Sequence, residues 1–226
     1  MLVMRTQVIY FIRHGETVLN AGGIRQGSEG PLSEQGVRQA KEVAQKFPKK
    51  RGKPQVIIAS PFQRTKETAA IIAEALNMKV EYCDLLVERK NPTEIIGHSG
   101  KEDQVKAIVD RIDKSFHDDN LRYSDEENFV DLKTRAKKIL EYIAGRKENQ
   151  LIMVTHSIFL RMVVSYIMVG DNLTASEYNK LSYLNPIDNA SLTICTRTSY
   201  WFKKDKWKLL VWDNIPQEDE PEDTEE

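Results

Sequence analysis

Unbroken apolar runs recur along the chain, and each one ends where polar residues begin. Such runs are typical of strands that are covered on both faces of a parallel sheet. Runs of this kind predict strands over residues 8–12, 56–59 and 151–154, and a further strand is predicted over residues 80–86. Apolar residues at helical spacing follow them and predict helices over residues 33–47, 62–76, 102–116, 129–143 and 157–169, with Ser33 as the N-cap of the first.

The pattern changes near the C-terminus, where residues 191–196 and 207–212 flank a lysine-rich turn. This arrangement predicts a closing antiparallel hairpin. The expected fold class is therefore α/β, a three-layer α/β/α sandwich around a mostly parallel mixed sheet with a C-terminal antiparallel hairpin. We expect one domain over residues 1–216, since 226 residues suit one large domain, and a disordered acidic tail over residues 217–226.

Composition narrows the classes of partner. The chain has 33 Lys and Arg against 34 Asp and Glu, so no overall basic field attracts nucleic acid or an anionic membrane. Its two cysteines lack metal-type spacing and are expected to be reduced thiols. The longest apolar stretch, residues 162–169, is too short for a bilayer, and the N-terminus has no signal-peptide pattern. The sequence predicts a cytoplasmic protein with no nucleic-acid or membrane partner and leaves its oligomeric state open.

Polar residues able to do chemistry follow all four predicted parallel strands. They are Arg13 and His14 after the first, Arg64 after the second, Glu88 after the third, and His156 with Ser157 after the fourth. The carboxyl ends of parallel strands meet at one edge of a sheet, which is where open α/β folds bind their ligands. We therefore expect these side chains to form one site.

This set of residues suits phosphoryl transfer. Two arginines match the charged oxygens of a phosphoryl group, and backbone N–H groups of the helices after residues 61 and 156 would add donors. One imidazole would attack in its neutral form while the other, charged, would stabilise the transferring group. Glu88 is the candidate acid that protonates the leaving oxygen, with Glu16 and Glu94 as alternatives, and activity should peak at mildly acidic to neutral pH.

These residues, with their neighbours in sequence, resemble the motifs of the histidine phosphatase superfamily, also called the phosphoglycerate mutase-like family. The resemblance rests on four motifs: Arg13-His14-Gly15-Glu16-Thr17 with Asn20 and Gln26-Gly27, then Ser60-Pro61-Phe62-Gln63-Arg64-Thr65, then Leu86-Val87-Glu88-Arg89, then Val154-Thr155-His156-Ser157. It implies that His14 is the nucleophile, that Arg13, Arg64 and His156 form the phosphate pocket, and that Glu88 is the proton donor. Asn20 and the backbone of Ser157 would be secondary phosphate contacts.

One departure from the family pattern bears on specificity. Mutases typically continue the Glu-Arg pair with an aromatic residue and Gly, whereas residues 90–94 read Lys-Asn-Pro-Thr-Glu here. This favours a phosphatase. Gly27 and Arg89 are candidate substrate contacts, and a surface ion pair is the alternative for Arg89. Residues 94–131 are expected to form a lid over the site.

Three functions stay open at this stage. The first is a metal-independent phosphatase that hydrolyses phosphomonoesters through phosphohistidine at His14, without a cofactor. The second is a cofactor-dependent phosphoglycerate mutase, and the third is a non-catalytic module that binds a phosphorylated ligand or a protein. The expected substrate is a phosphorylated small molecule or a phosphopeptide. His98 and His117 are expected to be solvated, and no metal site is expected from four histidines without paired ligand spacing.

Overall fold

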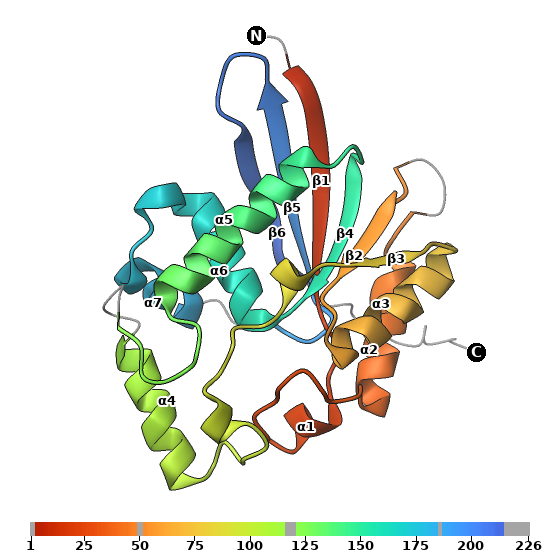
Figure 1. Cartoon of the computed structure of the whole chain (residues 1–226). Coiled ribbons are helices and arrows are strands. Elements are labelled where there is room, and N and C mark those ends of the chain that lie inside the picture. Colours follow the sequence, from red (N-terminus) through yellow and green to blue (C-terminus); the bar gives the residue numbers. More distant parts are fainter. Residues whose placement is uncertain (1–2, 49–51, 116–120, 185–186, 215–226) are drawn as a thin grey trace, which may run out of the picture.

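The computed structural model describes residues 3–48, 52–115, 121–184 and 187–214. Within them six strands form one sheet (Figure 1). Their bounds are β1 Val3–Arg13, β2 Val56–Ala59, β3 Val80–Tyr82, β4 Gln150–Thr155, β5 Leu192–Tyr200 and β6 Lys206–Asn214. The order across the sheet is β3-β2-β4-β1-β5-β6, with parallel pairs as far as β1 and antiparallel pairs for β1 with β5 and β5 with β6. The predicted mixed sheet with its closing hairpin is confirmed.

Helices connect the strands and cover the sheet. The α-helices in the described ranges are α1 Val18–Ala21, α2 Glu34–Gln45, α3 Gln63–Leu76, α4 Asp103–Ser115, α5 Phe129–Gly145, α6 Ser157–Val169 and α7 Ala175–Leu184. Short 3-10 helices are η1 Asp84–Leu86, η2 Thr93–Ile95 and η3 Gly170–Asn172. Ser33 caps α2 as predicted, since its side chain accepts from the N–H of Gly36. In the part of the chain that the structure describes, no helix has the length and hydropathy of a membrane span.

Two hydrophobic cores lie on opposite faces of the sheet. On one face, side chains of α2 and α3 such as Val43 and Ile72 pack on Ile57 and Ile152. On the other, α5 and α6 pack on the strand residues that point the opposite way, such as Phe11. Figure 1 shows α5 and α6 in front of the sheet and α2 with α3 on its other side. The strands are apolar in unbroken runs because both faces are buried, and this confirms the three-layer architecture.

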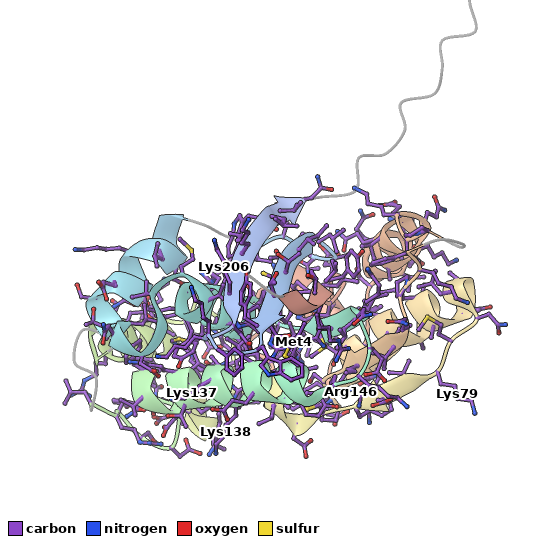
Figure 2. All side chains as sticks on the ribbon, turned by 90° about the horizontal axis from the view of Figure 1, so that it is seen from above. Met4, Lys79, Lys137, Lys138, Arg146 and Lys206 are labelled. Carbon is purple, nitrogen blue, oxygen red and sulfur yellow. The ribbon has the colours of Figure 1, made fainter. Side chains whose placement is uncertain are left out.

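The register brings the ends of the parallel strands into line. Arg13 pairs with Thr155, and Ala59 pairs with both Val154 and Tyr82. Loops after β1, β2 and β4 therefore leave the sheet at the same edge, the lower one in Figure 1, near α1 and α4. Figure 2 looks onto the opposite end of the molecule, where the labelled side chains of Lys79 and Arg146 lie.

Two of the differences from the sequence-based prediction have a clear physical reason. The strand expected over residues 80–86 ends at Tyr82, because the chain turns into η1 and buries Leu86 completely. Helix α7 was not predicted, since its described inward-facing residues Ala175 and Tyr178 leave a sparse apolar pattern. The tail over residues 217–226 and His117 lie outside the described residues.

Candidate active site

His14 follows directly on β1, at the carboxyl edge of the sheet. Its backbone N–H donates to the carbonyl of Thr155 at 3.0 Å, and the residue is only 4% exposed. Its ring nitrogen Nδ1 lies 2.7 Å from the carbonyl oxygen of Gly15. Because a carbonyl oxygen only accepts, this contact requires the proton on Nδ1 of a neutral ring and leaves Nε2 with a free lone pair. The backbone thus favours the tautomer in which Nε2 can act as a nucleophile.

Two glycines let the loop after β1 pack against the start of α2. A Cβ on Gly15 would lie 2.4 Å from the carbonyl oxygen of Gly36, and a Cβ on Gly36 would lie 2.0 Å from that of Glu16. The N–H of Gly15 donates to the hydroxyl of Thr68 at 3.1 Å, and this hydroxyl donates to the carbonyl of Arg64 at 2.7 Å. Thr68 therefore ties the loop after β1 to α3.

His156 occupies the N-cap position of α6 and is fully buried. Arg64 donates from Nε to His156 Nδ1 at 3.3 Å, and His156 Nε2 lies 2.9 Å from the hydroxyl oxygen of Ser60. An Nδ1 that accepts places the proton on Nε2, so Ser60 accepts from it. The ring centroids of His156 and His14 are 5.2 Å apart. Residues from the ends of three strands thus meet in one buried cluster, as the sequence predicted.

Arg64 is held from three sides in the first turn of α3. Besides its bond to His156, it donates from Nη1 to the carbonyl of Gly27 at 2.8 Å. Its guanidinium carbon lies 5.1 Å from the ring centroid of Phe62, and the residue is only 3% exposed. The fixed plane of this guanidinium suits bidentate contact with an oxyanion.

Glu88 binds the N-terminus of α6. Its Oε1 accepts from the N–H groups of Phe159 and Arg89, both at 2.9 Å, and its Oε2 accepts from the N–H of Ile158 at 3.1 Å. The sequence predicted that N–H groups of this helix would be phosphate donors. In the structure the N–H groups of Ile158 and Phe159 donate to Glu88 instead. The first turn of α6 has no side-chain cap, so its N–H groups need acceptors, and the Glu88 carboxylate lies within hydrogen-bond distance.

The segment before Glu88 is held by a residue that the sequence analysis missed. Arg135 on α5 donates from Nη1 to the carbonyls of Leu85 at 3.1 Å and Val87 at 2.6 Å. Thr155 supports the same segment by donating to the carbonyl of Leu86 at 2.8 Å. Arg135 gave no signal in the sequence, since an arginine on an amphipathic helix is expected to face solvent.

Arg13 adds a second cation, which is half-buried. It donates from Nη1 to the carbonyl of Ile187 at 2.5 Å, while its Nε is buried with no hydrogen-bond partner in the described part of the protein. Burial lowers the pKa of Arg13 and lowers that of Arg64 to about 10, while Glu88 opposes both shifts. A buried N–H without an acceptor is unfavourable, and a bound anion would satisfy it.

Both imidazoles are held neutral. Burial, followed by Arg64 and Arg13, keeps the pKa of His14 well below its ordinary value of 6.5. Burial, followed by Arg64 and His14, does the same to the pKa of His156. The expectation of a charged His156 is therefore wrong for the ligand-free protein, because a donating arginine occupies its Nδ1.

The remaining predicted site residues are Asn20, Gly27, Arg89 and Ser157. Asn20 lies on exposed α1, Ser157 begins α6, and the carbonyl of Gly27 receives Arg64. Arg89 is buried, so the alternative of a surface ion pair is wrong. His98 is exposed, as expected, and lies 3.2 Å from Glu102.

Neither alternative acid, Glu16 or Glu94, binds the N-terminus of α6 as Glu88 does. Glu16 accepts from the hydroxyl of Ser33 at the start of α2, and exposed Glu94 lies in η2. The described residues contain no group of three or more His, Cys, Asp or Glu side chains arranged to hold a metal ion.

Comparisons with known proteins extend over nearly the whole chain. The sequence model of the histidine phosphatase superfamily (branch 1) matches residues 9–214. The metal-independent phosphoserine phosphatase of Arabidopsis thaliana is 29% identical over 217 residues, which are 92% of this chain and 81% of that protein. The protein named "Probable phosphoglycerate mutase GpmB" of Erwinia tasmaniensis is 31% identical over 168 residues, 71% of this chain and 74% of that protein.

A solved structure shows the same fold. The mycobacterial glucosyl-3-phosphoglycerate phosphatase in complex with VO3 superposes with a TM-score of 0.72 at 24% identity, over 93% of this chain and 99% of the other. The sequence motifs, the strand order and the match over residues 9–214 agree with one another. This chain belongs to the histidine phosphatase superfamily, branch 1.

Proposed function

We propose that the protein is a phosphomonoester hydrolase that works through a phosphohistidine at His14. The observation that carries the proposal is the contact between His14 Nδ1 and the carbonyl of Gly15, which leaves Nε2 unprotonated. Arg13, Arg64 and His156 surround that ring. The two arginines would bind the phosphoryl oxygens, and His156 would join them by redirecting its Nε2–H from Ser60. Family membership and the phosphatases among the relatives support the same class of enzyme.

The proposed reaction has two steps. In the first, the Nε2 lone pair of His14 forms a bond to phosphorus, the ester P–O bond breaks, and protonated Glu88 gives its proton to the leaving oxygen. In the second, water attacks phosphorus, the N–P bond breaks, and Glu88 takes a proton from the water. Oε2 of Glu88 accepts one backbone bond where Oε1 accepts two, so Oε2 is the oxygen proposed to carry this proton. Asn20 and the Ser157 N–H are proposed secondary phosphate contacts.

Trapping the intermediate tests this proposal. A single turnover with a radiolabelled aryl phosphate, quenched in alkali, should leave acid-labile and base-stable phosphate on the chain. His14→Ala should abolish both labelling and turnover, whereas His98→Ala, which changes an exposed histidine, should alter neither. Full activity of His14→Ala would refute the proposal, and a wild-type chain that binds phosphate but never becomes labelled would point to a non-catalytic binding module.

A mutase is the second candidate, because one relative is named as a phosphoglycerate mutase. Incubation with 3-phosphoglycerate and a trace of 2,3-bisphosphoglycerate separates the two activities. We expect free phosphate to accumulate faster than the 2-phospho isomer. Isomer formation without release of phosphate would assign the mutase.

We further propose that the enzyme acts in the cytoplasm as a single domain over residues 1–216, on a phosphorylated small molecule. The two free thiols, Cys83 and buried Cys195, support a reducing compartment.

A further inference from the structure

A cavity of about 590 Å³ lies beside the cluster around His14. It is lined by residues of α4, α6 and α7 and by Arg25 and Arg89 from loops. Ile158 joins the cavity to the site, since its N–H donates to Glu88. Arg161 is close enough to Arg13 to affect its pKa. The volume is within the range of cavities that bind small molecules.

The lining is strongly cationic. Among the residues that the structure describes, three arginines and one lysine line it with one carboxylate, Asp113, although the whole chain is nearly neutral. Arg89 is buried and Lys180 is exposed at the rim. Cations close to one another in a partly buried cavity repel, and other contacts or a bound anion must offset this repulsion.

Arg25 is held in place although its own charge is poorly compensated. Its backbone pairs with the turn before α4, donating to the carbonyl of His98 at 2.9 Å and accepting from the N–H of Gly97 at 2.8 Å. Its guanidinium forms no hydrogen bond and no ion pair within 4.0 Å in the described part of the chain. Burial and neighbouring Arg89 both lower its pKa, and Asp113 opposes them. Arg25 therefore presents free donors to the cavity.

Arg161 has free donors as well. It links α6 to α7 by donating from Nη1 to the carbonyl of Ser182 at 3.0 Å and from Nε to that of Ser157 at 3.4 Å. The far wall is rigid, because Tyr178 is buried and donates to the carbonyl of Ile158 at 3.3 Å. Planar guanidinium groups in fixed positions match phosphate oxygens better than a flexible lysine does.

We infer that the leaving group of the substrate carries a second phosphate group, which Arg25, Arg89 and Arg161 bind in this cavity, with Lys180 at its rim. This inference rests on the proposed function. A dianionic phosphate fits better than a carboxylate because the four cations among the described lining residues outnumber the one described carboxylate, Asp113, by three charges. A neutral leaving group would leave the guanidinium of Arg25 without an acceptor among the described residues.

Binding of hydrolysis-resistant analogues tests the inference without requiring turnover. Alkane bisphosphonates of three to six carbons are compared by calorimetry with alkylphosphonates and ω-carboxyalkylphosphonates of equal length. We expect the best bisphosphonate to bind at least tenfold more tightly than either matched compound. Equal affinities across the three series would refute the inference, and equal affinity for carboxylate and phosphate would overturn the assignment of phosphate.

Variants locate the effect. Arg25→Gln should reduce the preference for the bisphosphonate by about tenfold or more, and Lys180→Gln should reduce it by less. In both variants the affinity for the alkylphosphonate should stay unchanged. Matched controls are Arg38→Gln on α2 and Lys79→Gln at the opposite end of the molecule (Figure 2), which should keep the preference. A preference that survives in the Arg25→Gln, Lys180→Gln double variant would refute the cavity as its source. Because turnover is not measured, a failure of the hydrolase proposal would be seen separately, in the trapping experiment.

Discussion

Arg64 donates from Nε to Nδ1 of His156 across 3.3 Å, so one arginine both supplies a cation and fixes the proton of a catalytic-site imidazole. The same side chain donates from Nη1 to the carbonyl of Gly27. Its contacts come from a loop and a strand end that are far apart in the sequence. Arg64 thus connects the loop that follows α1 to the residue that caps α6.

Replacing Arg64 with lysine keeps the positive charge but should still impair catalysis strongly. An ammonium cannot reach Gly27, His156 and a phosphoryl oxygen at once, so we expect kcat/KM for an aryl phosphate to fall about 100-fold. Steady-state kinetics of Arg64→Lys measure the effect. Arg38→Lys on the exposed face of α2 is the control and should keep full activity. A decrease of less than threefold for Arg64→Lys would show that charge alone suffices.

Stability should depend on pH through the two buried histidines. Their pKa values in the folded protein lie well below 6.5, so below that pH the unfolded chain binds protons that the folded one does not. Stability is therefore fully present above pH 6.5 and is lost as the pH falls, by up to about 1.4 kcal/mol per pH unit for each histidine.

Urea unfolding between pH 7 and pH 5 measures this dependence. His156→Gln should make the decline shallower by about half relative to wild type, since one of the two groups is removed. His98→Gln should keep the wild-type slope, because His98 is exposed. An unchanged slope in His156→Gln would contradict the depressed pKa.

The parts of the fold that the sequence predicted well are those where burial alone sets the pattern. The runs over residues 56–59 and 151–154 are buried on both faces and became β2 and β4. Glycine and histidine at strand ends were informative because a parallel register converts distance along the chain into proximity in space. The site cluster was therefore predictable from the sequence.

What the sequence could not predict depends on how separate segments pack together. One cavity is lined by Arg25 from a loop, Arg161 from α6 and Lys180 from α7. These residues share no sequence motif. The neutral state of His156 follows from a contact with Arg64 that spacing alone does not imply. Similarly, the sequence predicts that Glu88 is an acid, but the bonds of Glu88 to the first turn of α6 follow from the packing of two segments that are far apart in the sequence.

Gly36 should be indispensable for the packing that supports His14. Any Cβ there would lie 2.0 Å from the carbonyl oxygen of Glu16, so backbone must move. We expect Gly36→Ala to lower the free energy of unfolding by about 3 kcal/mol. Gly145→Ala in α5 is the matched control, because nothing lies within 4 Å of its Cβ, and it should be neutral or stabilising by about 0.5 kcal/mol. Equal stability of the two variants in urea unfolding would contradict the close approach.

The role of Glu88 can be tested through the leaving group. Within the described ranges Oε2 of Glu88 accepts only from the N–H of Ile158, so the proposed proton can reside there. In Glu88→Gln no acid is available, and hydrolysis of an alkyl phosphate, whose alkoxide is a poor leaving group, should slow about 1,000-fold. For p-nitrophenyl phosphate, whose phenolate leaves without protonation, the formation of the phosphohistidine should slow less than tenfold. A burst of p-nitrophenolate followed by slow turnover would then appear, since Glu88 is also needed to activate water. Equal losses for both substrates in the first step would show instead that Glu88 acts by holding the start of α6.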